Sequence, residues 1–217
     1  NDLIILTESV HRKLINTRIA VKIRTLELLS VLDMLCLVIL IVIQTLAAMK
    51  MSVLNKLLEQ RAYTDAHTGL PNKDACEVFL NNKETVAKHT ACIMFDLNNL
   101  KIINDTKGHS KGDQLILNFA RLLRNVIPQK DFVGRYGGDE FMVVIYNTIK
   151  TEIEDILKQL SREKDRLNSS GNNMPIDYAC GWAISDADSE CTIQMLLDKA
   201  DYYMYENKQA YKKSKKS

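Results

Sequence analysis

The chain divides into two parts by the pattern of its apolar and polar positions. Residues 34–49 carry no charged side chain, and the apolar run reaches back to Leu28 if Asp33 is tolerated within it. About 20 such residues are enough to cross the hydrocarbon core of a bilayer. Beyond about residue 62, short apolar runs alternate with polar turns, as in a folded domain of strands and helices. The pattern predicts a transmembrane segment at 28–49 and a globular domain at 63–217.

Helical patterns flank the apolar run on both sides. They form a stripe before the run and a short heptad-like seam after it: Val10, Leu14, Val21 and Leu28, then Met51, Leu54 and Leu58. We therefore expect a helical segment at 1–27 and a stalk helix at 50–62, joined into one helix through the membrane. Asp33 lies near one end of the span, where a charge costs less than at the centre. The alternative is a buried signalling helix in a soluble dimer.

Two acidic positions follow apolar runs in the second part. The run 90–95 ends at Asp96, and Gly137-Gly138 joins the apolar runs at 131–134 and 142–146, with Asp139 directly after the turn. Two glycines suit a tight hairpin turn and let an anion approach the backbone. If the two strands lie side by side, the two carboxylates face each other and form the oxygen-rich site that Mg²⁺ takes with nucleotide phosphates. The alternative for Gly-Gly-Asp alone is a solvated turn.

The remaining periodicities predict the other elements of the domain. A strand is expected at 175–182. Helical spacing recurs in two segments, which are Leu115, Phe119, Leu122 and Val126, and then Ile153, Ile156, Leu157 and Leu160. Residues 168–173 are expected to form a loop, and Thr192 can cap a last helix that runs to about Lys212. Strand, helices, hairpin, helix, strand and helix in this order predict an α+β fold, an antiparallel sheet with helices packed on it.

Several motifs carry a resemblance to a known family. In chain order they are Thr64–Lys73, Phe95–Asp105, Gly108-His109, Gly112-Asp113, Gly137–Phe141, and Ala200-Asp201 with Tyr205 and Lys208. On these motifs the chain resembles the diguanylate cyclase family, the GGDEF domains, from about Arg61 to Lys213. The resemblance implies a fold related to polymerase palm domains. It also implies the condensation of two GTP to cyclic di-GMP in a homodimer, with Mg²⁺ (or Mn²⁺) as cofactor and one GTP held by each subunit.

The resemblance implies a role for each reacting group. Asp96 and Asp139 match the metal-binding carboxylates, and the Leu97 carbonyl is the third ligand. In this family the acid at the Asp139 position is also treated as the base for the attacking hydroxyl. A metal-bound carboxylate is a poor base, so activation of the hydroxyl by the metal is an equal alternative. Glu140 is expected to tune this charge, and Lys101 to stabilise charge growing on the phosphates.

Other positions match the groups that bind the nucleotide. Asn104 and Asp113 match the pair that holds guanine, whose N1–H and N2–H₂ edge suits a carboxylate. Gly137 and Gly138 allow close approach of the phosphates, and Lys208 and Lys212 match the basic positions at the distal phosphates. Other motif residues have structural alternatives: Asp65 and Asn72 suit a turn as well as a ligand contact, and His109 suits a local hydrogen bond.

One segment departs from the family pattern. Many diguanylate cyclases carry Arg-x-x-Asp shortly before the hairpin, where product binds and inhibits. This chain has Pro128-Gln129-Lys130-Asp131, with proline in place of arginine. Because proline has no side-chain donor, we expect no high-affinity product inhibition.

Composition and charge narrow the setting. The net charge of +2 indicates no nucleic-acid surface. The five cysteines are odd in number and lack Cys-x-x-Cys spacing, which favours reduced thiols over disulfides or zinc.

Basic residues lie on both sides of 28–49 and do not set its orientation. Because GTP is cytoplasmic, we expect a bacterial inner-membrane protein with a cytoplasmic catalytic domain. The first residue, Asn1, suggests a fragment of a longer receptor whose sensor is missing. The competing function is a non-catalytic GGDEF module that binds GTP or signals by interaction.

Overall fold

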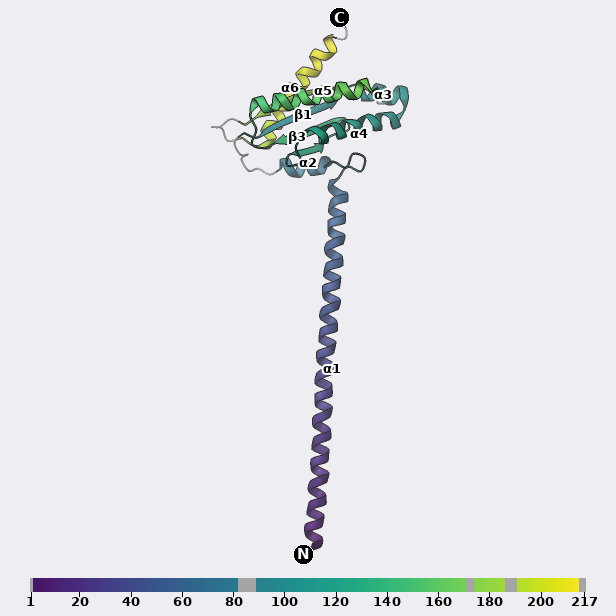
Figure 1. Cartoon of the computed structure of the whole chain (residues 1–217), viewed down its shortest axis with the longest axis vertical. Coiled ribbons are helices and arrows are strands. Elements are labelled where there is room, and N and C mark those ends of the chain that lie inside the picture. Colours follow the sequence, from purple (N-terminus) through teal and green to yellow (C-terminus); the bar gives the residue numbers. More distant parts are fainter. Residues whose placement is uncertain (1, 82–88, 171–173, 186–190, 215–217) are drawn as a thin grey trace. The chain divides into compact units, whose positions relative to one another are not determined.

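The computed structural model describes residues 2–81, 89–170, 174–185 and 191–214. Helices and strands follow in the order α1, α2, β1, α3, α4, β2, β3, α5, β4 and α6 (Figure 1). The chain forms two compact units, Asn1–Leu58 and Glu59–Ser217. The first unit consists of helix alone, and the second holds the sheet and the remaining helices.

The first unit belongs to one continuous helix, α1 (Asp2–Tyr63). The expected continuous helix is confirmed. The boundaries at 27 and 49 fall inside it and stay predictions. By length and composition this helix can cross a membrane, and none of its most apolar stretch is buried. Length and composition alone suggest a span only weakly, because a soluble protein's core helix or a signal sequence passes the same test.

The second unit is built on a four-stranded antiparallel sheet. Its strands are β1 (Ala91–Leu97), β2 (Phe132–Arg135), β3 (Glu140–Ile145) and β4 (Tyr178–Ile184), in the order β2-β3-β1-β4. Strand β1 lies between β3 and β4, and all of its residues are buried. The expected antiparallel α+β sheet is confirmed.

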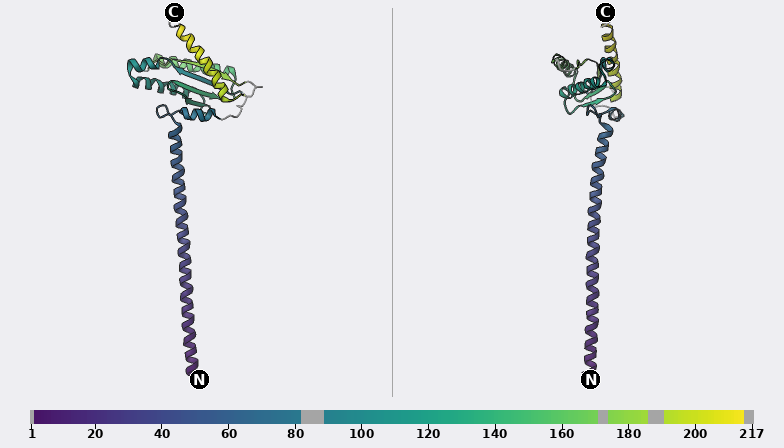
Figure 2. Two further views of the ribbon diagram at one scale, coloured as in Figure 1. Left: turned by 180° about the vertical axis from the view of Figure 1, so that it is seen from behind. Right: turned by 90° about the vertical axis from the view of Figure 1, so that its right-hand side faces the viewer.

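Helices cover both faces of the sheet (Figure 2). Helices α3 (Leu100–Lys107), α4 (His109–Val126) and α5 (Lys150–Ser169) pack on one face, and α2 (Lys73–Leu80) and α6 (Ile193–Ser214) pack on the other. Alternation along β1 separates the two cores. Ile93, Phe95 and Leu97 face α4, whereas Cys92 and Met94 face α2 and α6.

Strand β4 ends at Ile184 rather than at Trp182, and two further expected boundaries differ from the structure. Strand β4 begins at Tyr178 rather than at Pro175, and α5 continues through Asn168 to Ser169 instead of ending before it. Both differences come from one contact, because the Asn168 amide accepts from the Ile176 N–H and donates to the Ile176 carbonyl, each at 2.8 Å. Ile176 therefore bonds to the end of α5 and not to the sheet. The rest of the expected loop, 171–173, lies outside the described residues.

Candidate active site

Two carboxylates lie at adjoining strand ends. Strands β1 and β3 pair with Asp96 opposite Glu140, and the Leu97 N–H donates to the Asp139 carbonyl at 2.9 Å. The expected neighbourhood of Asp96 and Asp139 therefore follows from the register. Gly137, the first glycine of the turn, lies against the Glu140 side chain, since a Cβ on Gly137 would lie 2.6 Å from Glu140 Oε2.

The Asp96 carboxylate is almost wholly buried and only half satisfied. Its Oδ2 accepts from Lys208 Nζ at 2.5 Å, and its Oδ1 has no hydrogen-bond partner among the described residues. Burial and then the charges of Asp139 and Asp96 raise the pKa of Glu140 above its ordinary value. An unpartnered carboxylate oxygen within a group of acids fits a hard cation. Within the described part of the chain, no three His, Cys, Asp or Glu side chains group as metal ligands, so such a site would depend on two acids and a main-chain carbonyl.

A cavity of about 670 Å³ opens beside these strand ends. It is lined by residues from the end of β1, α3, the hairpin and the last turns of α6: Leu97, Asn98, Asn99, Leu100, Lys101, Ile102, Asp139, Lys208, Gln209, Tyr211, Lys212 and Lys213. The structure thus brings Asp139 together with Lys101, Lys208 and Lys212. The combination of a half-buried carboxylate and several ammonium groups suits a polyphosphate with its cation.

Asn104 and Asp113 come from two successive helices. A Cβ on Gly112 of α4 would lie 1.9 Å from Asn104 Oδ1 of α3, so only glycine admits that side chain. The same Oδ1 is buried and has no partner among the described residues. Asp113 follows Gly112 and is exposed. An amide oxygen and a carboxylate that have no hydrogen-bond partners among the described residues can bind a base edge with several donors and acceptors.

This part of the chain matches the family model for the diguanylate cyclase GGDEF domain over residues 62–214. The chain belongs to the GGDEF family. It is 30% identical over 165 residues to diguanylate cyclase DgcP of Escherichia coli, covering 74% of this chain and 48% of that protein. It is 32% identical over 146 residues to the cyclic di-GMP phosphodiesterase PdeB of Shewanella oneidensis, covering 66% of this chain and 17% of that protein. The chain spans about half or less of the length of these curated relatives.

Solved structures agree with the GGDEF assignment. The GGDEF domain of DgcB from Caulobacter crescentus, in complex with c-di-GMP, superposes with a TM-score of 0.59 at 25% identity. The alignment covers 69% of this chain and 89% of that one. The sheet and helices described above are therefore those of a GGDEF domain.

The loop from Thr64 to Pro71, here called the junction loop, is tied to the GGDEF hairpin. Asp65 accepts from the N–H and hydroxyl of Thr68 at 2.8 and 2.6 Å and pairs with Arg135 at 3.0 Å. Burial raises the pKa of the Asp65 carboxyl, but hydrogen bonds from Thr68 and Arg135 outweigh it and leave that pKa below its ordinary value. Arg135 also donates to the Gly138 carbonyl at 2.8 Å. Asp65 could have served a turn or a ligand contact, and these contacts favour the structural role in the turn.

Asn72 also makes structural contacts in this GGDEF domain. Its side chain caps α2 by accepting from the Ala75 N–H at 3.0 Å, and it donates to the Ala62 carbonyl at the end of α1 at 2.7 Å. His109 begins α4 and is exposed. The sequence patterns gave no role to Arg135, although an arginine two residues before a Gly-Gly turn was a visible signal.

Asp131, expected near a product site, faces inward. Its Oδ1 accepts from the Tyr146 N–H at 3.1 Å, and the residue is 9% exposed. It lines a separate cavity of about 490 Å³ with Arg124, Pro128 and Phe132. One oxygen of this carboxylate therefore holds the end of β3, whereas Oδ2 is buried and has no hydrogen-bond partner among the described residues.

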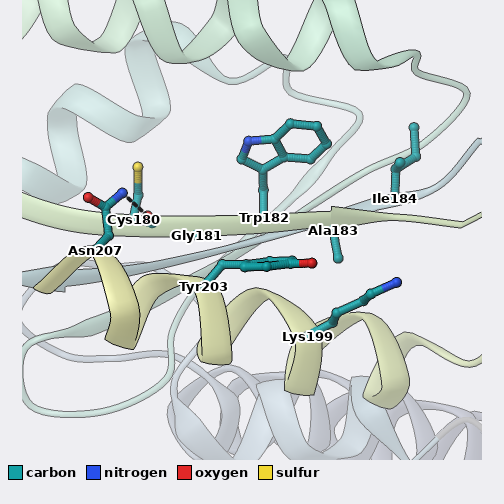
Figure 3. Close-up of a pocket in the computed structure, with 8 residues that line it drawn as sticks. All are labelled: Cys180, Gly181, Trp182, Ala183, Ile184, Lys199, Tyr203 and Asn207. Atoms are coloured by element: carbon teal, nitrogen blue, oxygen red, sulfur yellow. Dashed lines mark hydrogen bonds between the residues drawn. The ribbon is translucent and has the colours of Figure 1, made fainter. Parts of the chain in front are cut away.

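A further cavity of about 440 Å³ lies along β4 and α6, away from the two acids (Figure 3). Trp182 points to one side of the strand and Tyr203 lies on the other, while the Asn207 amide donates to the Cys180 carbonyl at 3.0 Å. Its lining contains no carboxylate and none of the candidate site residues. Of the cavities described here, the one at Asp139 is the cavity that combines a carboxylate with several of the candidate site residues.

Proposed function

We propose that this chain is a diguanylate cyclase that condenses two GTP molecules to cyclic di-GMP and two pyrophosphates. The observation that carries the proposal is the placement of Asp96 and Asp139 at adjoining strand ends beside a cavity lined by lysines. The family match and the name of the E. coli relative support it.

The reaction needs a divalent cation, and the residues present fit one. Asp96, Asp139 and the Leu97 carbonyl would hold Mg²⁺ or Mn²⁺. Such an ion, when bound, neutralises phosphate charge and makes the attacking hydroxyl more acidic. Lys208 places its ammonium at the Asp96 carboxylate, and Lys101 and Lys212 line the same cavity, where phosphate oxygens would lie. Asp139 can take the hydroxyl proton or leave it to solvent.

Base selection falls to Asn104 and Asp113. The Asp113 carboxylate accepts from a guanine edge that presents two donors, and adenine presents no such pair. The unpartnered Oδ1 of Asn104 can accept a further hydrogen bond. Gly137 and Gly138 leave the hairpin backbone open to the phosphates, since a Cβ on Gly138 would meet no atom within 4 Å.

Each active site holds one GTP, so the reaction requires two copies of the domain facing each other. The seam of Met51, Leu54 and Leu58 on α1 is the surface we assign to dimer formation, and all three residues are exposed. The proposal places 28–49 in a bacterial inner membrane and 63–217 in the cytoplasm, where GTP is found.

The central test is product formation by the full chain. Incubated with GTP and Mg²⁺, it should yield cyclic di-GMP, detected by mass. Asp96→Ala and Asp139→Ala should each lower turnover by about 10²-fold or more, because each removes a carboxylate from a two-acid site. Asp105→Ala, an exposed acid on α3, is the matched control and should stay active. Near-normal turnover in either strand-end variant would remove the assignment.

The same assay separates the second candidate, a non-catalytic module. It is kept because a relative of similar identity is named as a phosphodiesterase. Binding of GTP without any cyclic di-GMP would support the module and reject the cyclase.

Product feedback is the finer part of the proposal. Pro128 supplies no side-chain donor, and Asp131 is engaged with the Tyr146 N–H. We expect cyclic di-GMP at micromolar levels to leave GTP turnover almost unchanged. Non-competitive inhibition that Asp131→Ala abolishes would contradict this expectation, whereas inhibition competitive with GTP would not.

A further inference from the structure

One contact joins the junction loop to the helix that carries Asp113. His67 Nε2 lies 2.8 Å from the Asp113 main-chain oxygen. A carbonyl oxygen only accepts, so the imidazole nitrogen donates. The two residues are 46 positions apart in the chain, and both are exposed. The bond therefore holds together two segments that are far apart in the sequence.

The acceptor is the main chain of the residue proposed to read guanine. Asp113 lies in the second turn of α4, directly after the Gly112 position that admits Asn104. A bond to its carbonyl restrains the backbone from which its carboxylate projects. The Asp113 residue is exposed, and its carboxylate has no hydrogen bond or ion pair among the described residues, so it is open to a ligand.

The junction loop also restrains the other half of the site. Asp65 of the same loop holds Arg135, which in turn holds the Gly138 carbonyl beside Asp139. Arg124 of α4 donates to the Gly69 carbonyl. One short loop thus contacts both the hairpin with the metal-binding acid and the helix with the base-reading acid.

We propose that His67 is a positioning residue for base selection: through the Asp113 carbonyl it sets where the Asp113 carboxylate meets the guanine edge. This rests on the proposed function of GTP binding. Because the bond is exposed and competes with water, its loss should change affinity for the guanine nucleotide by about three- to tenfold. The chemical step should be unaffected, because His67 does not line the cavity at Asp139.

The probes are GTP and ATP with a methylene group between the α and β phosphates, which bind but cannot lose pyrophosphate. Both are titrated calorimetrically into the full chain with Mg²⁺. His67→Ala should weaken binding of the guanine analogue about three- to tenfold and leave the adenine analogue almost unchanged. His67→Gln should restore most of the affinity, because its amide N–H reaches about as far as Nε2. Turnover of saturating GTP should change less than twofold in both variants.

A double-mutant cycle shows whether His67 acts through Asp113. In an Asp113→Ser background, His67→Ala should have little further effect on the ratio of the two affinities. If His67→Ala changes that ratio as much in the Asp113→Ser background as in the unaltered chain, or weakens binding of both analogues equally, the role of His67 is overturned while GTP recognition stands. A wild-type chain that binds neither analogue, or both alike, would overturn GTP recognition and this inference together. Ala66→Ser in the same loop is the matched control and should leave both affinities unchanged.

Discussion

At the scale of single residues, Gly112 makes the sharpest prediction. Gly112→Ala places a Cβ where Asn104 Oδ1 now lies and forces that side chain aside. Alanine is the better helix former by about 1 kcal/mol, so thermal stability should hold or rise. Affinity for GTP should fall about tenfold or more because the amide is displaced. The pair of measurements is a melting curve and a GTP titration.

The control is Ser110→Ala, at an exposed position in the first turn of the same helix, which should change neither stability nor GTP affinity. A Gly112→Ala chain that loses stability in step with affinity would show that Gly112 serves packing and not the Asn104 position. A chain that keeps full affinity would show that Asn104 does not bind the base.

Sequence patterns predicted some site residues and missed others for a physical reason. Asp96 and Asp139 were predictable because Asp96 ends an apolar run and Asp139 follows the Gly-Gly turn that leads into the adjoining strand. The contacts of His67 and Arg135 were not, because their partners lie 46 and 70 positions away. No local pattern encodes which main-chain oxygen a distant side chain will reach.

At the scale of elements, the packing of α6 on β4 depends on one glycine. A Cβ on Gly181 would lie 2.1 Å from the Met204 nitrogen and 2.3 Å from the Ala200 carbonyl oxygen. Both are backbone atoms of a helix, so the strand and helix must separate. Gly181→Ala should lower the free energy of unfolding by about 1–3 kcal/mol, as overpacking commonly does. Denaturant unfolding of the full chain, followed by the Trp182 fluorescence, measures it.

Turnover distinguishes this effect from general damage. Lys208 projects from α6 to Asp96, so a displaced helix should also reduce cyclase activity. The conservative change Ala183→Ser on the same strand face is the comparison and should cost less. Equal stability of Gly181→Ala and the unaltered chain would mean that α6 does not pack this closely.

Element boundaries show the same limit of sequence patterns. Apolar patterns correctly gave β1, the hairpin strands and helices α4 and α5. They placed the start of β4 too early because Asn168 captures both backbone groups of Ile176. A side chain that competes for main-chain hydrogen bonds moves a strand end without changing the apolar pattern.

At the scale of the whole molecule, the open question is what surrounds α1. Its large apolar residues between 28 and 49 are exposed, and such a surface is stable in lipid or against another chain. We expect the full chain to remain in the membrane fraction after an alkaline carbonate wash. Leu37→Lys with Ile41→Lys should release it, because each charge near the centre of a span costs about 2.5–3.5 kcal/mol.

The stalk provides the matched variant. Leu54→Lys with Leu58→Lys lies outside 28–49, so the chain should stay in the membrane. Because these residues belong to the seam assigned to the dimer, cyclic di-GMP synthesis should fall, since two domains must meet to join two GTP molecules.

A wild-type chain found in the soluble fraction as a dimer would favour a buried signalling helix over a membrane span. Membrane retention of the Leu37/Ile41 variant would contradict the span at 28–49, because a helix carrying two central lysines has lost most of the free energy that keeps it in lipid.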